Sequence, residues 1–146
     1  MPREMRAAPR SGCVRFNGMC RLLLVDDNVQ LLDFYGLVLE QAGHHVLVAE
    51  TCRRAIALLE ESDPEIVIMD LRVPALEDGL GLIRSVKAHK QAPGKPAVKI
   101  VVTSGWTADL AGKPERESVD CILPKPVRME ALLQSISRLA PAGAGR

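Results

Sequence analysis

Three aspartates and one lysine stand at or just after the ends of short apolar runs in the sequence: Asp26, Asp27, Asp70 and Lys125. If the runs are parallel strands, these side chains meet at the sheet edge where open α/β folds bind ligands. The adjacent carboxylates repel each other unless a cation or hydrogen-bond donors offset their charge. Magnesium prefers oxygen ligands and is typically held by one or two carboxylates plus a phosphate. The four residues therefore predict a site for a magnesium ion and a phosphoryl group.

A carboxylate beside a metal can also act as a nucleophile. Asp70 could accept a phosphoryl group as an aspartyl phosphate, and Lys125 would then pair with the phosphate oxygens. A hydroxyl from Thr103 or Ser104 could donate a further hydrogen bond, but neighbours on a strand point to opposite faces, so only one can reach the phosphate. Considered singly, the aspartate pair equally fits helix capping, and the other two charges fit an ordinary surface.

The elements that must position these residues alternate between apolar runs and helical periods. Strands are predicted at 22–25, 46–49, 65–69, 99–103 and 119–123. Apolar residues at helical spacing predict helices that follow Asn28 and end at Gly43, that follow Thr51, that surround 82–86, and that span 108–118 and 129–139. This alternation is typical of βαβ units on a parallel sheet. The fold class is therefore predicted to be doubly wound α/β, with five strands and five helices.

The fourth helix is the weakest element of this pattern. Residues 108–118 contain Gly112 and Pro114, which cost about 1 and 3 kcal/mol in a helix interior. We expect a short, broken or irregular helix there.

Composition limits the classes of protein that fit. A chain of 146 residues, 47% apolar, has room for one core. No apolar stretch approaches the length of a membrane helix and residues 1–20 lack a signal-peptide core, so a cytoplasmic location without membrane contact is expected. The four cysteines show no C-x-x-C pairing, which favours reduced thiols. Scattered arginines without interleaved aromatics give weak support for nucleic-acid binding, and none is expected.

Three segments are predicted along the chain. Residues 1–20 mix Arg, Pro, Gly and Ala without periodicity, as in a disordered basic arm; translation starting at Met19 would leave most of this arm out. Residues 21–140 form the domain. Residues 141–146 form a flexible tail.

Five short motifs occur in a fixed order: Leu24-Val25-Asp26-Asp27-Asn28, Met69-Asp70-Leu71-Arg72-Val73-Pro74, Asp78-Gly79, Thr103-Ser104-Gly105 and Leu123-Pro124-Lys125-Pro126. In this order and spacing they resemble the receiver domain of bacterial two-component response regulators, over roughly residues 20–140. The resemblance implies a flavodoxin-like sheet of strand order 2-1-3-4-5. It also implies a phosphoacceptor signalling domain rather than an enzyme.

The family's site residues transfer to this chain by its motifs. The resemblance implies that Asp70 accepts a phosphoryl group from the phosphohistidine of a sensor histidine kinase or histidine phosphotransfer protein. Asp27 and Asp70 would bind Mg²⁺ directly and Asp26 through water, and the backbone carbonyl of Arg72 would complete the protein ligands. Lys125 would contact the phosphate.

Two further features come from the same resemblance. The Lys125–Pro126 peptide is expected to be cis. The switch hydroxyl is expected to be Ser104, since a Ser-Gly pair fills the place of the commoner Thr-Ala, with Thr103 as the alternative. Phosphorylation would draw that hydroxyl inward and shift the loop after the fourth strand.

Some positions depart from the family pattern. Ile122 stands where an aromatic switch residue is usual, and the loop 74–79 is one residue longer than the common spacing.

No output domain follows the last helix, so we expect a single-domain regulator that signals through contact with a protein target not identifiable from the sequence. Arg72 and Trp106 are placed where they could screen the phosphoryl group from water, although ordinary loop packing explains them equally well.

Other classes fit less well. A haloacid dehalogenase would need a second aspartate where Arg72 stands, and a nucleotide-binding enzyme would need a glycine-rich loop after the first strand. The remaining alternative is a pseudo-receiver, which keeps the fold as a phosphorylation-independent interaction module.

Overall fold

The computed structural model describes residues 19–89, 93–94 and 96–140. The strands are β1 (Arg21–Val25), β2 (His45–Ala49), β3 (Ile66–Asp70), β4 (Lys99–Ser104) and β5 (Cys121–Pro124). The α-helices are α1 (Val29–Gln41), α2 (Cys52–Ser62), α3 (Leu76–Ala88) and α4 (Met129–Leu139). All strand pairs are parallel, in the order β2-β1-β3-β4-β5. The predicted flavodoxin-like fold and strand order are confirmed.

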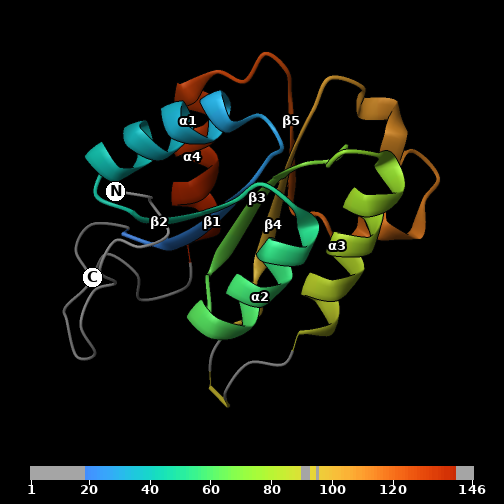
Figure 1. The fold of residues 1–146 in the computed structure, drawn as a ribbon, viewed down its shortest axis with the longest axis horizontal. Helices are drawn as coiled ribbons and strands as arrows, with labels where there is room; N and C mark the ends of the chain where they lie inside the picture. Colours follow the sequence, from blue (N-terminus) through green and yellow to red (C-terminus); the bar gives the residue numbers. More distant parts are fainter. Residues whose placement is uncertain (1–18, 90–92, 95, 141–146) are drawn as a thin grey trace.

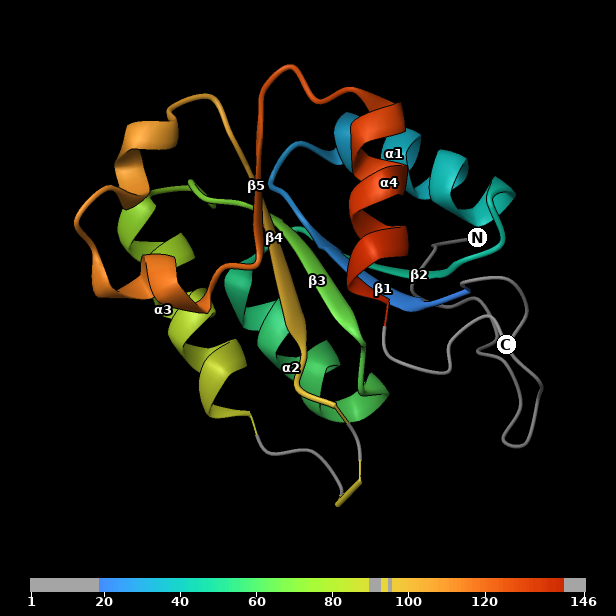
Figure 2. The same cartoon turned by 180° about the vertical axis from the view of Figure 1, so that it is seen from behind.

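The sheet lies between two layers of helices. Helices α2 and α3 cover one face, and α1 and α4 cover the other, as the two opposite views show (Figures 1 and 2). Because both faces are covered, β1 carries an unbroken apolar run and is buried from Leu22 to Val25.

Alternate strand residues supply two separate cores. Leu23 and Val25 belong to the cluster under α2 and α3, whereas Leu22 and Leu24 belong to the cluster under α1 and α4. Cys20 has no exposed surface and extends the second cluster beyond the start of β1. Packing on both faces of the sheet therefore fixes the register of the strands. Their carboxyl ends form one well-defined edge of the sheet.

The helix starts follow the capping signals of the sequence. The side chain of Asn28 accepts a hydrogen bond from the backbone N–H of Leu31 at 3.2 Å, and that of Thr51 accepts one from Arg54 at 3.1 Å. Each side chain therefore caps the helix that the sequence predicted to follow it.

The region predicted as a fourth helix is broken. Two 3₁₀ helices, η2 (Thr107–Leu110) and η3 (Pro114–Ser118), replace it, so the described residues contain four α-helices instead of five. Gly112 lies between them with a φ of +72°, a backbone conformation that suits glycine and ends a right-handed helix. The expectation of an irregular segment is confirmed, and the count of five helices is corrected.

Other boundaries differ more modestly. Helix α3 starts at Leu76, so most of the predicted loop 74–79 is its first turn. The carboxylate of Asp78 accepts a hydrogen bond from the backbone N–H of Ala75 at 3.2 Å, which stabilises this early start. Strand β5 begins at Cys121 rather than residue 119.

Several predictions concern other parts of the chain. The predicted basic arm, apart from its last two residues, and the predicted tail lie outside the described residues. Among the helices of the described residues, none is long and apolar enough to cross a membrane. Cys20, Cys52 and Cys121 form no disulfide within the described part of the chain. The Lys125–Pro126 peptide is cis, as expected, and Val73–Pro74 is cis as well.

Candidate functional site

The carboxyl edge of the sheet collects the residues that the sequence singled out. Asp26 directly follows β1, Asp70 is the last residue of β3, and Ser104 is the last residue of β4. Strand register places Asp70 opposite Thr103, and Ser104 opposite Pro124. Lys125, the next residue, donates its backbone N–H to the carbonyl of Ser104 at 2.9 Å. Strands β1, β3, β4 and β5 thus deliver all these groups to one place.

Three carboxylates form a group that could hold a metal ion. Asp26, Asp27 and Asp70 each offer an oxygen, and these oxygens lie within 4.8 Å of one another. Asp26 is 5% exposed, and one of its oxygens accepts a hydrogen bond from the backbone N–H of Asn28 at 2.9 Å. The three oxygens fit the donor set of a hard divalent cation, because Mg²⁺ takes carboxylate oxygens and keeps several waters.

The electrostatics of this group favour a cation. Burial raises the pKa of Asp26 above its usual value, and the negative charges of Asp70 and Asp27 act in the same direction. The Asn28 N–H and the Lys125 ammonium lower that pKa, with less effect than burial. A bound cation would offset both the burial and the mutual repulsion of the carboxylates.

Lys125 supplies the positive charge of the site. Its Nζ lies 3.1 Å from Oδ2 of Asp70 and 3.9 Å from Oδ2 of Asp26. The ammonium is thus placed to contact any anionic group attached to Asp70. Since it is a compact point charge on a flexible stem, it can follow new oxygens by a small movement.

The two candidate hydroxyls are both buried but have different partners. Thr103 donates its hydroxyl to the carbonyl of Met69 at 3.4 Å and lines a small cavity together with Asp26, Tyr35 and Asp70. The Ser104 hydroxyl oxygen accepts a hydrogen bond from the backbone N–H of Trp106 at 3.0 Å. Ser104 therefore acts as an acceptor there, and its own proton remains for another acceptor.

Arg72 approaches the site with its backbone and turns its side chain elsewhere. Its N–H donates to Oδ1 of Asp70 at 3.4 Å, while its guanidinium makes two hydrogen bonds of 2.9 Å to Asp109 in η2. The Trp106 side chain is exposed. The sequence did not single out Asp109, because an acid in a broken helical segment carries no distinctive signal.

Tyr35 was also missed as a neighbour of the site. It lies at the apolar spacing of α1, which is typical of core residues, and it packs against the core under α1 and α4. It also lines the cavity beneath Asp26 and Asp70, and burial raises the pKa of its phenol.

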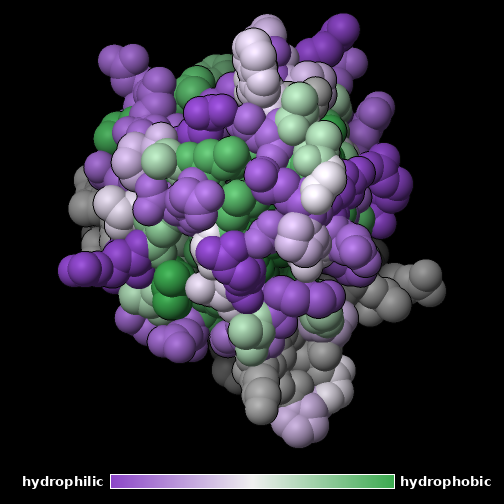
Figure 3. Space-filling model, turned by 90° about the vertical axis from the view of Figure 1, so that its right-hand side faces the viewer, coloured by the Kyte–Doolittle hydropathy of each residue, from purple (hydrophilic) through white to green (hydrophobic). Residues whose placement is uncertain are grey.

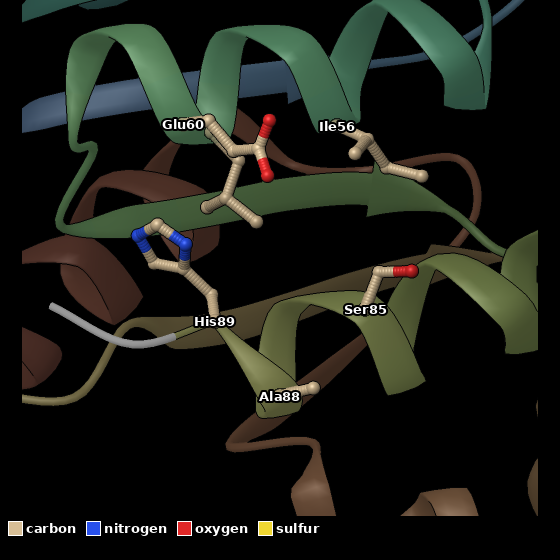
Figure 4. A pocket seen from close by; sticks show the side chains of 6 residues that line it. Ile56, Glu60, Ser85, Ala88 and His89 are labelled. Carbon is tan, nitrogen blue, oxygen red and sulfur yellow. The ribbon is translucent and has the colours of Figure 1, made fainter.

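A second hollow, of about 610 Å³, lies between α2 and α3. Figure 4 shows the residues that line it. Ile56 and Glu60 come from α2, Ser85 and Ala88 come from α3, and His89 is the residue that caps the end of α3. None of the acidic cluster residues lines it. The candidate chemistry therefore lies at the sheet edge and not in this hollow.

Comparison with known proteins identifies the relatives of this chain. The model of the response regulator receiver domain matches residues 22–137. The protein PilH of Pseudomonas aeruginosa is 31% identical over 119 residues, which cover 82% of this chain and 96% of PilH. The transcriptional regulatory protein GlrR of Escherichia coli is 35% identical over 115 residues, covering 79% of this chain but only 25% of GlrR.

Solved structures agree with these sequence relatives. The signal receiver domain of a response regulator from Bermanella marisrubri superposes with a TM-score of 0.70 at 34% identity, covering 83% of this chain and 98% of that one.

Proposed function

The chain belongs to the response regulator receiver domain family, and on this premise we propose that Asp70 accepts a phosphoryl group from a phosphohistidine. An oxygen of the Asp70 carboxylate attacks phosphorus, the bond between phosphorus and the histidine nitrogen breaks, and the imidazole leaves with that electron pair. The product is an acyl phosphate on Asp70. The observation that carries the proposal is the Lys125 ammonium, 3.1 Å from Asp70 and beside two further carboxylates.

The carboxylate cluster supports a magnesium-dependent reaction. Asp26, Asp27, Asp70 and the backbone carbonyl of Arg72 would hold Mg²⁺, which when bound neutralises phosphoryl oxygens and orients them for in-line attack. Lys125 would stabilise the charge that develops on the same oxygens. Within this arrangement Asp70 is the nucleophile, and the role of Asp26 and Asp27 is to bind the cation.

Ser104 is the proposed switch hydroxyl. Its proton can be donated to a phosphoryl oxygen, whereas the proton of Thr103 is already given to the carbonyl of Met69. Turning the Ser104 hydroxyl toward Asp70 would weaken its bond to the N–H of Trp106. The loop after β4 would then change conformation in response to phosphorylation.

The partners follow from this chemistry. The phosphodonor would be a sensor histidine kinase or a histidine phosphotransfer protein, and the output would be phosphorylation-dependent contact with a protein target in the cytoplasm. Nothing in this role requires nucleic acid or a membrane.

Intact mass measurement after incubation with Mg²⁺ and acetyl phosphate tests the proposal. The wild-type protein should gain the mass of one phosphoryl group, and Asp70→Asn should gain none. Asp33→Asn, which changes an exposed aspartate of α1, is the matched control and should gain the same mass as wild type. An unmodified wild-type protein would favour the pseudo-receiver, which binds partners without phosphorylation.

A further inference from the structure

Asp109 holds the side chain of Arg72 through two hydrogen bonds. Nε of Arg72 donates to Oδ2 of Asp109, and a terminal guanidinium nitrogen donates to Oδ1, both at 2.9 Å. This bidentate arrangement is among the strong forms of an ion pair. The Asp109 side chain is only 8% exposed, whereas that of Arg72 is 54% exposed. The carboxylate has thus lost most of its water and depends on the guanidinium for compensation.

The negative charge of Asp70, the proposed phosphoacceptor, also acts on this guanidinium. The hydrogen bonds and the charge of Asp109 raise the pKa of Arg72, and the charge of Asp70 raises it further. The backbone N–H of Arg72 is already 3.4 Å from Oδ1 of Asp70. Arg72 therefore reaches Asp70 with its backbone N–H and pairs with Asp109 in η2 through its side chain.

A phosphoryl group on Asp70 would change this balance. Such a group carries about two negative charges and three strong acceptor oxygens. A guanidinium matches phosphate geometry as well as it matches a carboxylate. The more highly charged partner would then lie on the Asp70 side.

We propose that Asp109 is a positioning residue for the phosphoryl site: it holds the Arg72 guanidinium in the unmodified protein and yields it to the phosphoryl oxygens once Asp70 is phosphorylated. This inference rests on the proposed function. It links the state of Asp70 to η2, because the transfer of Arg72 removes an ion pair that fixes this 3₁₀ helix.

A second ion pair provides an internal comparison. Arg84 in α3 pairs with Glu115 in η3, and the Glu115 side chain is 10% exposed while that of Arg84 is 57% exposed. Each 3₁₀ helix thus has one well-covered acid bound to one exposed arginine. The side of the molecule that carries α3 and both 3₁₀ helices shows mainly hydrophilic side chains (Figure 3). Of these two arginines, only Arg72 also contacts Asp70, through its backbone N–H.

The position of Arg72 should affect hydrolysis of the acyl phosphate. In that reaction water attacks phosphorus, the bond to the Asp70 oxygen breaks, the carboxylate is restored, and both hydrogens of the water leave with inorganic phosphate. A guanidinium on the phosphoryl oxygens hinders the approach of water. Asp109 competes for that guanidinium, so removing its charge should lengthen the lifetime of the phosphoryl group.

The lifetime of the adduct, formed with acetyl phosphate and Mg²⁺ and followed by intact mass after the donor is removed, tests this directly. Asp109→Asn should lengthen the lifetime by about threefold or more, given the strength of hydrogen bonds to charged groups. Asp109→Glu keeps the charge and should stay near wild type. Glu115→Gln removes the comparison pair and should leave the lifetime unchanged.

A double variant separates positioning from a purely structural role. Arg72→Gln should shorten the lifetime, and adding Asp109→Asn to it should have no further effect, because Asp109 acts only through Arg72. Additive effects of the two changes would overturn the proposal.

Hydrogen exchange gives a second readout. Backbone amides of residues 107–113 should exchange faster in the phosphorylated wild-type protein than in the unmodified one. In Asp109→Asn they should exchange fast in both states. If the wild-type adduct forms but exchange is the same in both states, the inference fails while the proposed function stands; if no adduct forms on wild type, both fail.

Discussion

The backbone of Gly79 in α3 packs directly against the carbonyl group of Leu71. A Cβ atom at position 79 would overlap the carbonyl oxygen of Leu71. Leu71 is the residue after Asp70, so this contact seats the first turn of α3 against the backbone that carries the proposed phosphoacceptor. The glycine is needed here for close approach, since the neighbouring atoms are main-chain atoms that cannot move aside independently.

Gly79→Ala should therefore destabilise the protein strongly. Overpacking against a fixed backbone costs about 1–3 kcal/mol or more, which would appear as a lower midpoint in urea unfolding. Gly81→Ala is the matched control in the same helix, because its Cβ would meet only the end of the Arg84 side chain at 3.6 Å. It should gain up to about 1 kcal/mol from helix propensity. Equal stabilities of the two variants would contradict the packing argument.

Lys125→Gln should have opposite effects on two properties of the site. Phosphorylation by acetyl phosphate should slow by roughly a hundredfold, since the ammonium stabilises charge that develops in the transition state. Binding of Mg²⁺ should tighten, because a positive charge 3.1 Å from Asp70 is removed. Stopped-flow phosphorylation and a magnesium titration measure the two effects, with the exposed Lys87→Gln as control. Loss of both phosphorylation and Mg²⁺ binding would indicate misfolding instead.

The indole of Trp106 should report on Ser104. The backbone N–H of Trp106 bonds to the Ser104 hydroxyl, so movement of that hydroxyl toward a phosphoryl group should change Trp106 fluorescence, the only tryptophan signal in the chain. Ser104→Ala should phosphorylate with little or no change in fluorescence. Thr103→Val should keep the change; the reverse pattern would make Thr103 the switch hydroxyl.

The residues found from sequence share one property: their positions follow from local patterns. Asp26, Asp70 and Lys125 end apolar runs, and parallel strands bring such ends together whatever the details of packing. The strand order itself came from resemblance to a family, because local periodicity does not specify which strands are neighbours. Boundaries shifted where hydrogen bonds outside the pattern decided them, as with Asp78 at the start of α3.

The features missed from sequence depend on tertiary contact. Asp109 became significant only because η2 brings it to Arg72, 37 residues away in the chain. Tyr35 has the spacing of an ordinary core residue, and only the fold brings it to the cavity that Asp70 also lines. Ile122, where the family usually has an aromatic residue, packs at the margin of the core under α2 and α3. An aliphatic side chain there is compatible with a core role.

His44 should make the stability of the fold depend on pH. Its Nδ1 accepts a hydrogen bond from the backbone N–H of Cys20 at 3.1 Å, and burial lowers its pKa. The unfolded chain, with a histidine pKa near 6.5, therefore takes up a proton at a pH where the folded chain still excludes it. The contribution of His44 to stability should be fully present above about pH 7.5. It should be lost as the pH drops through about 6.5 toward the lower pKa of the folded state.

His44→Asn separates this effect from other titrations. The asparagine oxygen can accept the same N–H of Cys20 but does not titrate. The free energy of unfolding, measured in urea between about pH 7.5 and 5.5, should fall less steeply for the variant than for wild type. Some slope should remain, because burial also lowers the pKa of the neighbouring His45. Parallel slopes for the two proteins would mean that His44 is equally easy to protonate in the folded and unfolded chain, contrary to its buried acceptor role.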